Sequence, residues 1–292
     1  MTAMINDMKK RTKIFIFLAT IVSSALLLAN TRLGVFLVFD VLGGSTDNLV
    51  TDSNAGPLNI SRSLLADSSF TLPDELEQPS GIIVDESTVY ISTDQAELFV
   101  LDRQFKLKEQ KSNLIGGILL LKQGSLEAIS LADEQIVGIG EIGVIGNWAR
   151  TMNNWLRLED SPLPDSLSGN EFTGVCMNSM GSWATTDSAH YLFNLDNGSE
   201  HSIHYGSFAK PESDLTQLMI SGIDCNEDNY YLITENYTSI IVLGLDFRAI
   251  EVIGIDAGEA SDIAIHNLSA YVTVDHNLFD DRPPVYRYEL AQ

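Results

Sequence analysis

The chain has 292 residues, of which 45% are hydrophobic, and it carries 40 acidic against 17 basic side chains. That length and apolar content are enough for one or two domains with a sizeable core. A formal net charge of −23 repels phosphate backbones, whose neutralisation supplies most nucleic-acid affinity, so the composition excludes DNA and RNA as partners.

The N-terminal 43 residues predict a membrane anchor. Residues 1–13 include four basic side chains directly before an uncharged apolar run at 14–29. Basic residues at that place hold the N-terminus in the cytoplasm, so we expect the rest of the chain to be exported. The run is shorter than the roughly 20 residues of a spanning helix, but apolar residues resume at 33–39, and we assign the anchor region to 14–43. A cleaved signal peptide is the competing interpretation, although a clear small-x-small cleavage site is missing.

Residues 44–70 are rich in Gly, Ser, Asn and Asp and are predicted to be a polar linker. The remaining residues, 71–292, then form the folded domain. Almost all of the negative charge lies there, because residues 1–45 hold five basic and two acidic side chains.

One pattern occurs five times in the C-terminal domain: a small residue, an apolar pair, a turn, a short apolar strand and an acid. The five copies are the segments 80–94, 127–141, 173–187, 221–235 and 261–275. Their second residues lie 47, 46, 48 and 40 positions apart and are Gly81, Ala128, Gly174, Gly222 and Asp262. In every copy the terminal acid follows the second residue by 13 positions.

A period of 40 to 50 residues indicates a propeller, a solenoid or an array, and the content of the unit decides between them. Short runs rich in β-branched and aromatic residues alternate with Asp, Asn, Glu and Ser clusters, which predicts antiparallel strands. We therefore expect an all-β fold, a β-propeller of five four-stranded blades behind an N-terminal transmembrane helix. A sixth blade built partly from residues 50–75 is the alternative. The small second residue is expected to lie in the innermost strand, where the blades converge.

The terminal acids suggest a site. In an antiparallel pair the start of one strand lies beside the end of the next, so these acids and the residue before each small position share one rim of the channel. The predicted ligand-binding residues are Asp94, Glu127, Glu141, Asp187, Glu235 and Asp275. Oxygen ligands suit Ca²⁺, which makes calcium a candidate cofactor held by Glu127, Glu141 and Asp187. The competing interpretation is that these acids cap turns at strand ends.

The two cysteines, Cys176 and Cys225, leave two alternatives open. They pair as one disulfide if the domain lies in an oxidising compartment, or they are two buried free thiols.

The order of the motifs resembles the SdiA-regulated (YjiK-like) family of bacterial membrane-anchored propellers over residues 72–290. The motifs that carry the resemblance are Pro79-Ser80-Gly81-Ile82, Leu126-Glu127-Ala128-Ile129, Phe172-Thr173-Gly174-Val175, Ile220-Ser221-Gly222-Ile223, Asn277-Leu278-Phe279 and Val285-Tyr286-Arg287-Tyr288. The resemblance implies a single-pass inner-membrane protein whose propeller lies in the periplasm, and it implies no reaction.

Two departures from the family pattern concern the expected site. The family commonly has Glu before the small residue in the second, third and fifth repeats, but only Glu127 keeps it here, since Thr173 and Ser261 stand at the other two positions. An insertion at 280–284 also divides the closing motif.

The function expected from these features is non-enzymatic: a propeller that binds an unknown periplasmic ligand or protein while the N-terminal helix holds it at the inner membrane. The alternative is a divalent-cation-dependent hydrolase, lactonase- or phosphoesterase-like, with its metal at the channel mouth. No nucleophile elbow, phosphate-binding P-loop or H-E-x-x-H motif occurs in the chain.

Overall fold

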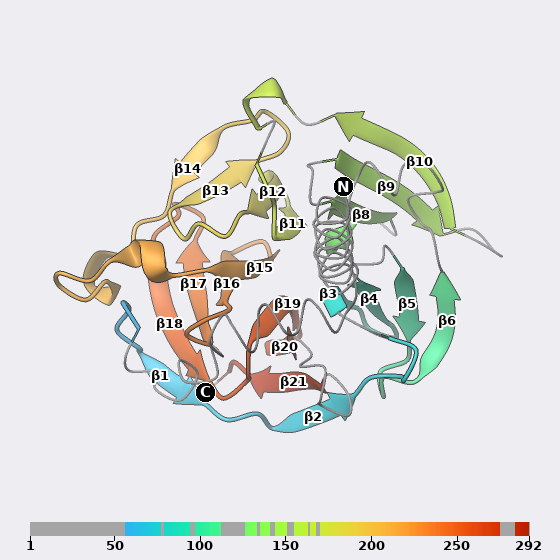
Figure 1. Ribbon diagram of the computed structural model, residues 1–292, viewed down its shortest axis with the longest axis horizontal. Helices are drawn as coiled ribbons and strands as arrows, with labels where there is room; N and C mark the ends of the chain where they lie inside the picture. Colours follow the sequence, from blue (N-terminus) through green and yellow to red (C-terminus); the bar gives the residue numbers. More distant parts are fainter. Residues whose placement is uncertain are drawn as a thin grey trace, which may run out of the picture. The chain divides into compact units, whose positions relative to one another are not determined.

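The structure is a computed structural model that describes residues 56–76, 79–93, 97–111, 126–132, 135–140, 144–150, 155–162, 164–167, 170–274 and 284–291. The strands among these residues form five sheets, which we number as blades 1 to 5 (Figure 1). Each sheet begins with the first strand of one sequence repeat. The prediction of a five-bladed β-propeller is therefore confirmed, and no sixth sheet is present among the described residues.

In blades 1 to 3 the strands follow one another in sequence from the innermost outwards. Blade 1 consists of β3 (Pro79–Val84), β4 (Val89–Thr93), β5 (Leu98–Leu101) and β6 (Leu107–Lys111). Blade 2 consists of β7 (Leu126–Ala132), β8 (Gln135–Gly140), β9 (Val144–Arg150) and β10 (Trp155–Pro162). Blade 3 consists of β11 (Gly174–Asn178), β12 (Gly181–Thr185), β13 (Tyr191–Asn194) and β14 (Glu200–Ser202).

The last two blades each take one strand from the N-terminal side of the repeats. Blade 4 consists of β15 (Ile220–Cys225), β16 (Asn229–Thr234), β17 (Ser239–Gly244), β18 (Ala249–Ile255) and β1 (Arg62–Leu64). Blade 5 consists of β19 (Ala260–His266), β20 (Ser269–Val274), β21 (Pro284–Glu289) and β2 (Ser68–Thr71). Within the described ranges, three short 3-10 helices lie in connections: η4 (Asp165–Leu167), η5 (Gly206–Phe208) and η6 (Leu215–Gln217).

The ring is closed by the segment that was expected to be a linker. In Figure 1, β2 (blue) runs beside β21 (red) as the outermost strand of blade 5, and β1 extends blade 4 by pairing in parallel with β18. An ion pair of 2.6 Å between Arg62 and Glu251 fastens β1 to β18. The folded domain thus begins earlier than residue 71. The polar composition of this segment suggested a linker because an outermost strand stays largely in contact with solvent: the residues of β2 alternate between intermediate and full exposure.

The hydrophobic core is divided among the blade interfaces. Five clusters of buried side chains are found in the described part of the chain, and each joins two consecutive blades, with blade 5 joined to blade 1. Between blades 3 and 4, for example, Trp183 packs edge-on against Tyr230, with ring centroids 5.4 Å apart. Each sheet therefore covers its apolar faces only by standing next to its neighbours, which is the physical reason for radial repetition.

The innermost strands approach so closely that the small second residue is required. A Cβ at Gly174 would lie 2.7 Å from the backbone nitrogen of Ile223 in the next blade. A Cβ at Gly81 would lie 3.0 Å from the backbone nitrogen of Ile129, also in the next blade. The expectation that the small residue lies where the blades converge is confirmed.

Among the described residues, no helix is long and apolar enough to cross a membrane. The predicted anchor region, 14–43, lies outside those residues.

Candidate functional site

Two of the predicted site acids lie at the mouth of the channel where the innermost strands begin. Asp187 follows β12, whose last residue pairs with the first residue of β11. Glu235 directly follows β16, whose last residue, Thr234, pairs with Ile220 at the start of β15. The predicted strand geometry is therefore confirmed for these two acids.

Two further acids that the sequence reasoning missed affect this mouth. Burial raises the pKa of Asp187, and the negative charge of Glu171 raises it further. Burial also raises the pKa of Glu235, with added repulsion from Glu259 and Asp187. We call these four residues, Glu171, Asp187, Glu235 and Glu259, the acidic mouth. Glu171 and Glu259 stand shortly before the first strands of blades 3 and 5, so an acid just ahead of the repeat was the signal that could have revealed them.

Of the four other predicted acids, only Glu127 lies among the described residues. Glu127 lies in β7, near the start of the innermost strand of blade 2. Asp94, Glu141 and Asp275 lie outside the described residues. Of the proposed calcium ligands, Asp187 is thus the one whose side chain can be placed, and the residues that the structure describes contain no group of three or more His, Cys, Asp or Glu able to hold a metal ion.

In the family that this chain resembles, glutamate is common at the positions of Thr173 and Ser261. Here the hydroxyl groups of these two residues form hydrogen bonds between strands. The Thr173 hydroxyl donates to the carbonyl oxygen of Ile220 in the next blade at 2.9 Å. The Ser261 hydroxyl donates to the hydroxyl of Thr273 across blade 5 at 2.8 Å. Both side chains therefore join strands at this mouth.

Two carboxyl groups deeper in the channel connect consecutive blades. Asp224 of β15 accepts hydrogen bonds from the backbone N–H of Ile265 in blade 5 at 2.6 Å and from that of Cys225 at 2.8 Å. Asp262 of β19, which is 2% exposed, accepts from the backbone N–H of Ile82 in blade 1 at 2.8 Å. Asp262 occupies the second position of its repeat, where the other copies have Gly or Ala. Its carboxyl group lies against Gly222, which leaves the room that it needs.

Burial dominates the electrostatics of both groups. It raises the pKa of Asp224 to about 7, against the lowering effect of the two backbone N–H donors. It raises the pKa of Asp262 well above its usual range, and the charge of Asp224 adds to that effect. Asp224 keeps some accessible surface although protein surrounds it, because it faces the open space of the channel.

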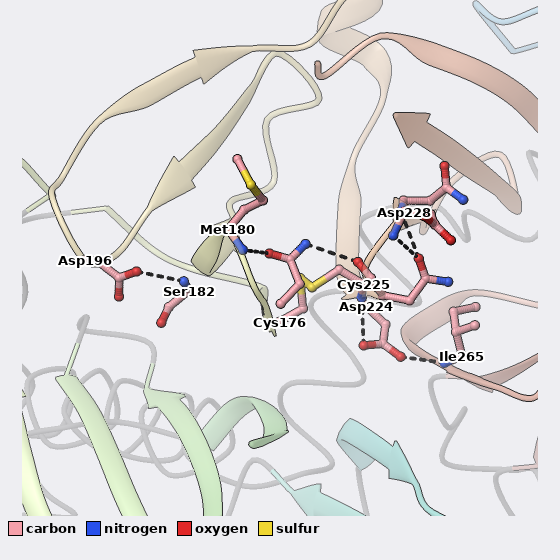
Figure 2. Close-up of a disulfide and its surroundings, with 11 residues drawn as sticks. Cys176, Met180, Ser182, Asp196, Asp224, Cys225, Asp228 and Ile265 are labelled. Carbon is pink, nitrogen blue, oxygen red and sulfur yellow. Dashed lines mark hydrogen bonds between the residues drawn. A yellow bond between two sulfur atoms is a disulfide. The ribbon is translucent and has the colours of Figure 1, made fainter. Parts of the chain in front are cut away.

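A disulfide joins the same region. Cys176 of β11 is bonded to Cys225 of β15, with Cα atoms 5.7 Å apart, beside Asp224 (Figure 2). The alternative of two free thiols is therefore wrong. The bond closes a loop over a sequence separation of 49 residues, which corresponds to about 4 kcal/mol in the chain-entropy account of disulfide stabilisation. It holds the innermost strands of blades 3 and 4 together.

Comparisons with known proteins support the fold. No family model and no curated protein matches the sequence. The structure is similar to glutaminyl cyclase from Myxococcus xanthus, with a TM-score of 0.57 and 11% identity over 79% of this chain and 97% of that one. A calcium-binding protein, regucalcin, from Agrobacterium tumefaciens gives a TM-score of 0.49 at 11% identity over 79% and 96% of the two chains. At such identities the likeness to the cyclase shows the fold alone, a β-propeller.

The buried carboxyl of Asp224 predicts a specific pH dependence of stability. Its folded pKa of about 7 exceeds the ordinary value of 3.8, so the folded state binds the proton more tightly. The resulting stability is complete below pH 4 and is lost as the pH rises to 7, at up to about 1.4 kcal/mol for each unit of pKa shift. Replacing Asp224 by Asn should therefore flatten the decline of the unfolding free energy between pH 4 and 7, measured by urea denaturation.

The matched control is Asp228→Asn, at an exposed acid of the adjacent β15–β16 hairpin. It should leave the slope of the profile as it is in the wild type. Parallel profiles for the wild type and Asp224→Asn would contradict the assignment of a buried, proton-binding carboxyl.

Proposed function

We propose that this chain is an inner-membrane-anchored periplasmic propeller of the SdiA-regulated type, which binds a cationic ligand or a partner protein at the acidic mouth. The observation that carries the proposal is that Asp187 and Glu235 lie side by side at the start of β15: the Asp187 carbonyl accepts from Ile220 N–H at 3.1 Å, and Glu235 N–H donates to the Met219 carbonyl at 3.0 Å. The charges of Glu171 and Glu259 add to the repulsion at this place.

Carboxylates that repel one another gain stability when a positive group comes between them. Glu235 and Glu259 are partly buried, and Glu171 and Asp187 are exposed, so the acidic mouth is accessible from solvent. A basic segment of a partner supplies such a positive group and needs no set of three or more metal ligands, which the described residues do not supply. A divalent cation such as Ca²⁺ is the simplest probe of the same charge.

The environment of the mouth favours binding over hydrolysis. A hydrolase of the alternative type requires a bound metal with an open coordination position or a base next to a nucleophile. At two of the positions where the resembling family has glutamates, this chain has Thr173 and Ser261, whose hydroxyls are hydrogen-bonded to neighbouring strands. A binding surface needs only the charge and the rigid rim that the blades supply.

The disulfide supports the proposed periplasmic location, because such bonds persist in oxidising compartments and are rare in the cytosol. Thiol alkylation of acid-quenched, denatured bacterial cells tests this location, since Cys176 is buried in the folded chain and denaturation gives the reagent access to it. We expect Cys176 and Cys225 of the full chain to resist a thiol reagent until a reductant is added, since they are bonded to each other. A variant without residues 1–43, which stays in the cytoplasm, is the control and should be alkylated directly. Equal alkylation of both chains would count against export.

Calcium titration with a thermal shift readout tests the acidic mouth. Binding to the folded state alone stabilises it by about 2.7 kcal/mol at a concentration of 100 Kd, so calcium should raise the Tm of the full chain and a chelator should reverse the rise. The double variant Asp187→Asn/Glu235→Gln should lose the calcium response. Without calcium it should melt above the wild type, because the repulsion is removed.

The matched control is Glu227→Gln/Asp228→Asn, which removes the same charge from the β15–β16 hairpin at the opposite end of β15. Its calcium response should equal that of the wild type. If calcium gives no saturable shift, or the same shift in both double variants, the acidic mouth is not a cation site.

A further inference from the structure

The channel contains a cavity at the end opposite the acidic mouth. It has a volume of about 190 Å³, and its wall takes residues from the innermost strands of all five blades. On β3 the wall runs from Ile82 to Val84 and continues to Asp85, and on β15 it runs from Ile223 to Cys225, so it follows the later part of each strand. We call this space the channel cavity.

The residues that line the channel cavity are mostly apolar in type, but most of the surface that its wall exposes is polar. Isoleucines from four blades, together with Leu131 and Met177, supply most of its side chains. Asp224 and Asp85 are its acids, and no Lys, Arg or His is among the described residues that line it. The wall thus combines negative charge with apolar side chains and polar surface, and its described residues include no basic side chain to balance that charge.

Asp224 is held in one orientation toward this space. One carboxylate oxygen accepts from Ile265 N–H and the other from Cys225 N–H, and Figure 2 shows both bonds beside the disulfide. A carboxylate has about four lone-pair sites, so two backbone bonds leave it with acceptor capacity. The disulfide fixes the strand that carries Asp224, so little ordering remains for a ligand to impose.

We propose that the channel cavity binds a small organic ammonium ion, with Asp224 as its counter-charge. An ammonium group has three N–H donors for the remaining lone pairs of the carboxylate, and a hydrogen bond between two charged groups is stronger than one between neutral groups. The apolar side chains of the wall contact the small hydrocarbon body, while the polar part of the wall stays in contact with water because the cavity is partly open. A Ca²⁺ ion suits the space poorly, since it requires six to eight oxygen ligands.

The volume limits the size of this ligand. A cavity of about 150 Å³ accommodates benzene in an engineered protein, so the channel cavity accepts a body of about seven non-hydrogen atoms. Cyclohexylamine has that size and carries its charge at one end, which makes it a suitable probe. Cyclohexanol and cyclohexanecarboxylate have the same ring with a neutral and an anionic head group.

The protonation of Asp224 determines the conditions of the test. Burial raises its pKa to about 7, so a measurement at pH 8 uses mainly the carboxylate form. The acidic groups near it are Asp262 on β19 and Asp85 after β3, and β11 presents the disulfide. A bound ammonium ion should in turn favour the ionised form of Asp224.

Isothermal titration calorimetry of the full chain in lipid nanodiscs, with empty nanodiscs as the blank, tests the proposal. We expect saturable binding of cyclohexylamine at least tenfold tighter than that of cyclohexanol, and no binding of the carboxylate. Asp224→Asn should weaken amine binding at least tenfold. Asp262→Asn is the matched control, because Asp262 also bonds to the next blade but does not line the cavity, and it should retain the wild-type affinity.

A second variant keeps the test decisive if Asp224→Asn does not fold. Met177→Trp adds volume at the cavity wall without changing the charge and should abolish amine binding, whereas the acidic-mouth variant Asp187→Asn/Glu235→Gln should leave it intact. The proposal is overturned if the amine and the alcohol bind equally, if Asp224→Asn or Met177→Trp binds like the wild type, or if no amine binding occurs up to about 10 mM.

Discussion

The close approach of the five innermost strands is the constraint on which the rest of this structure depends. Consecutive blades meet where Gly81, Gly174 and Gly222 leave no room for a Cβ, and this contact sets the width of the channel. The same crowding explains the exception in the fifth repeat, where the Asp262 side chain enters the gap beside Gly222 and bonds to the backbone of blade 1. The apolar clusters between blades add stability, but their geometry follows from how the strands meet at the centre.

The sequence was sufficient to predict the propeller and its number of blades, because each copy of the repeat spans the innermost strand of a blade and the strand beside it. It also placed Asp187 and Glu235 at one mouth, since antiparallel pairing brings the end of one strand to the start of the other. It could not reveal the contribution of β1 and β2, because short, half-exposed outer strands have the composition of a linker. The sequence also offered no indication that Asp224 connects two blades. That connection is a hydrogen bond from Ile265, which is 41 residues away, and no local sequence pattern predicts such a contact.

The two ends of the channel differ in chemistry although the same strands build both. At the mouth where the strands begin, carboxylates lie near the surface and repel one another, so a partner there gains mainly from charge. At the other end, one oriented carboxylate lies among isoleucines beside a disulfide, so a ligand there must match the shape of the cavity as well as the charge. The pairing of β2 with β21 closes the ring by joining the N-terminal side of the folded domain to the last blade.

The central claim, that strand convergence at the small second residue holds the ring together, is tested most directly by the unfolding free energy of Gly174→Ala. The added Cβ would meet the Ile223 backbone nitrogen and the Thr185 hydroxyl, each at 2.7 Å, so it must push blades 3 and 4 apart. We predict a loss of about 2 kcal/mol or more in urea denaturation, whereas Gly258→Ala, where a Cβ meets nothing within 4 Å, should be close to neutral. Equal unfolding free energies for the two variants would contradict the account.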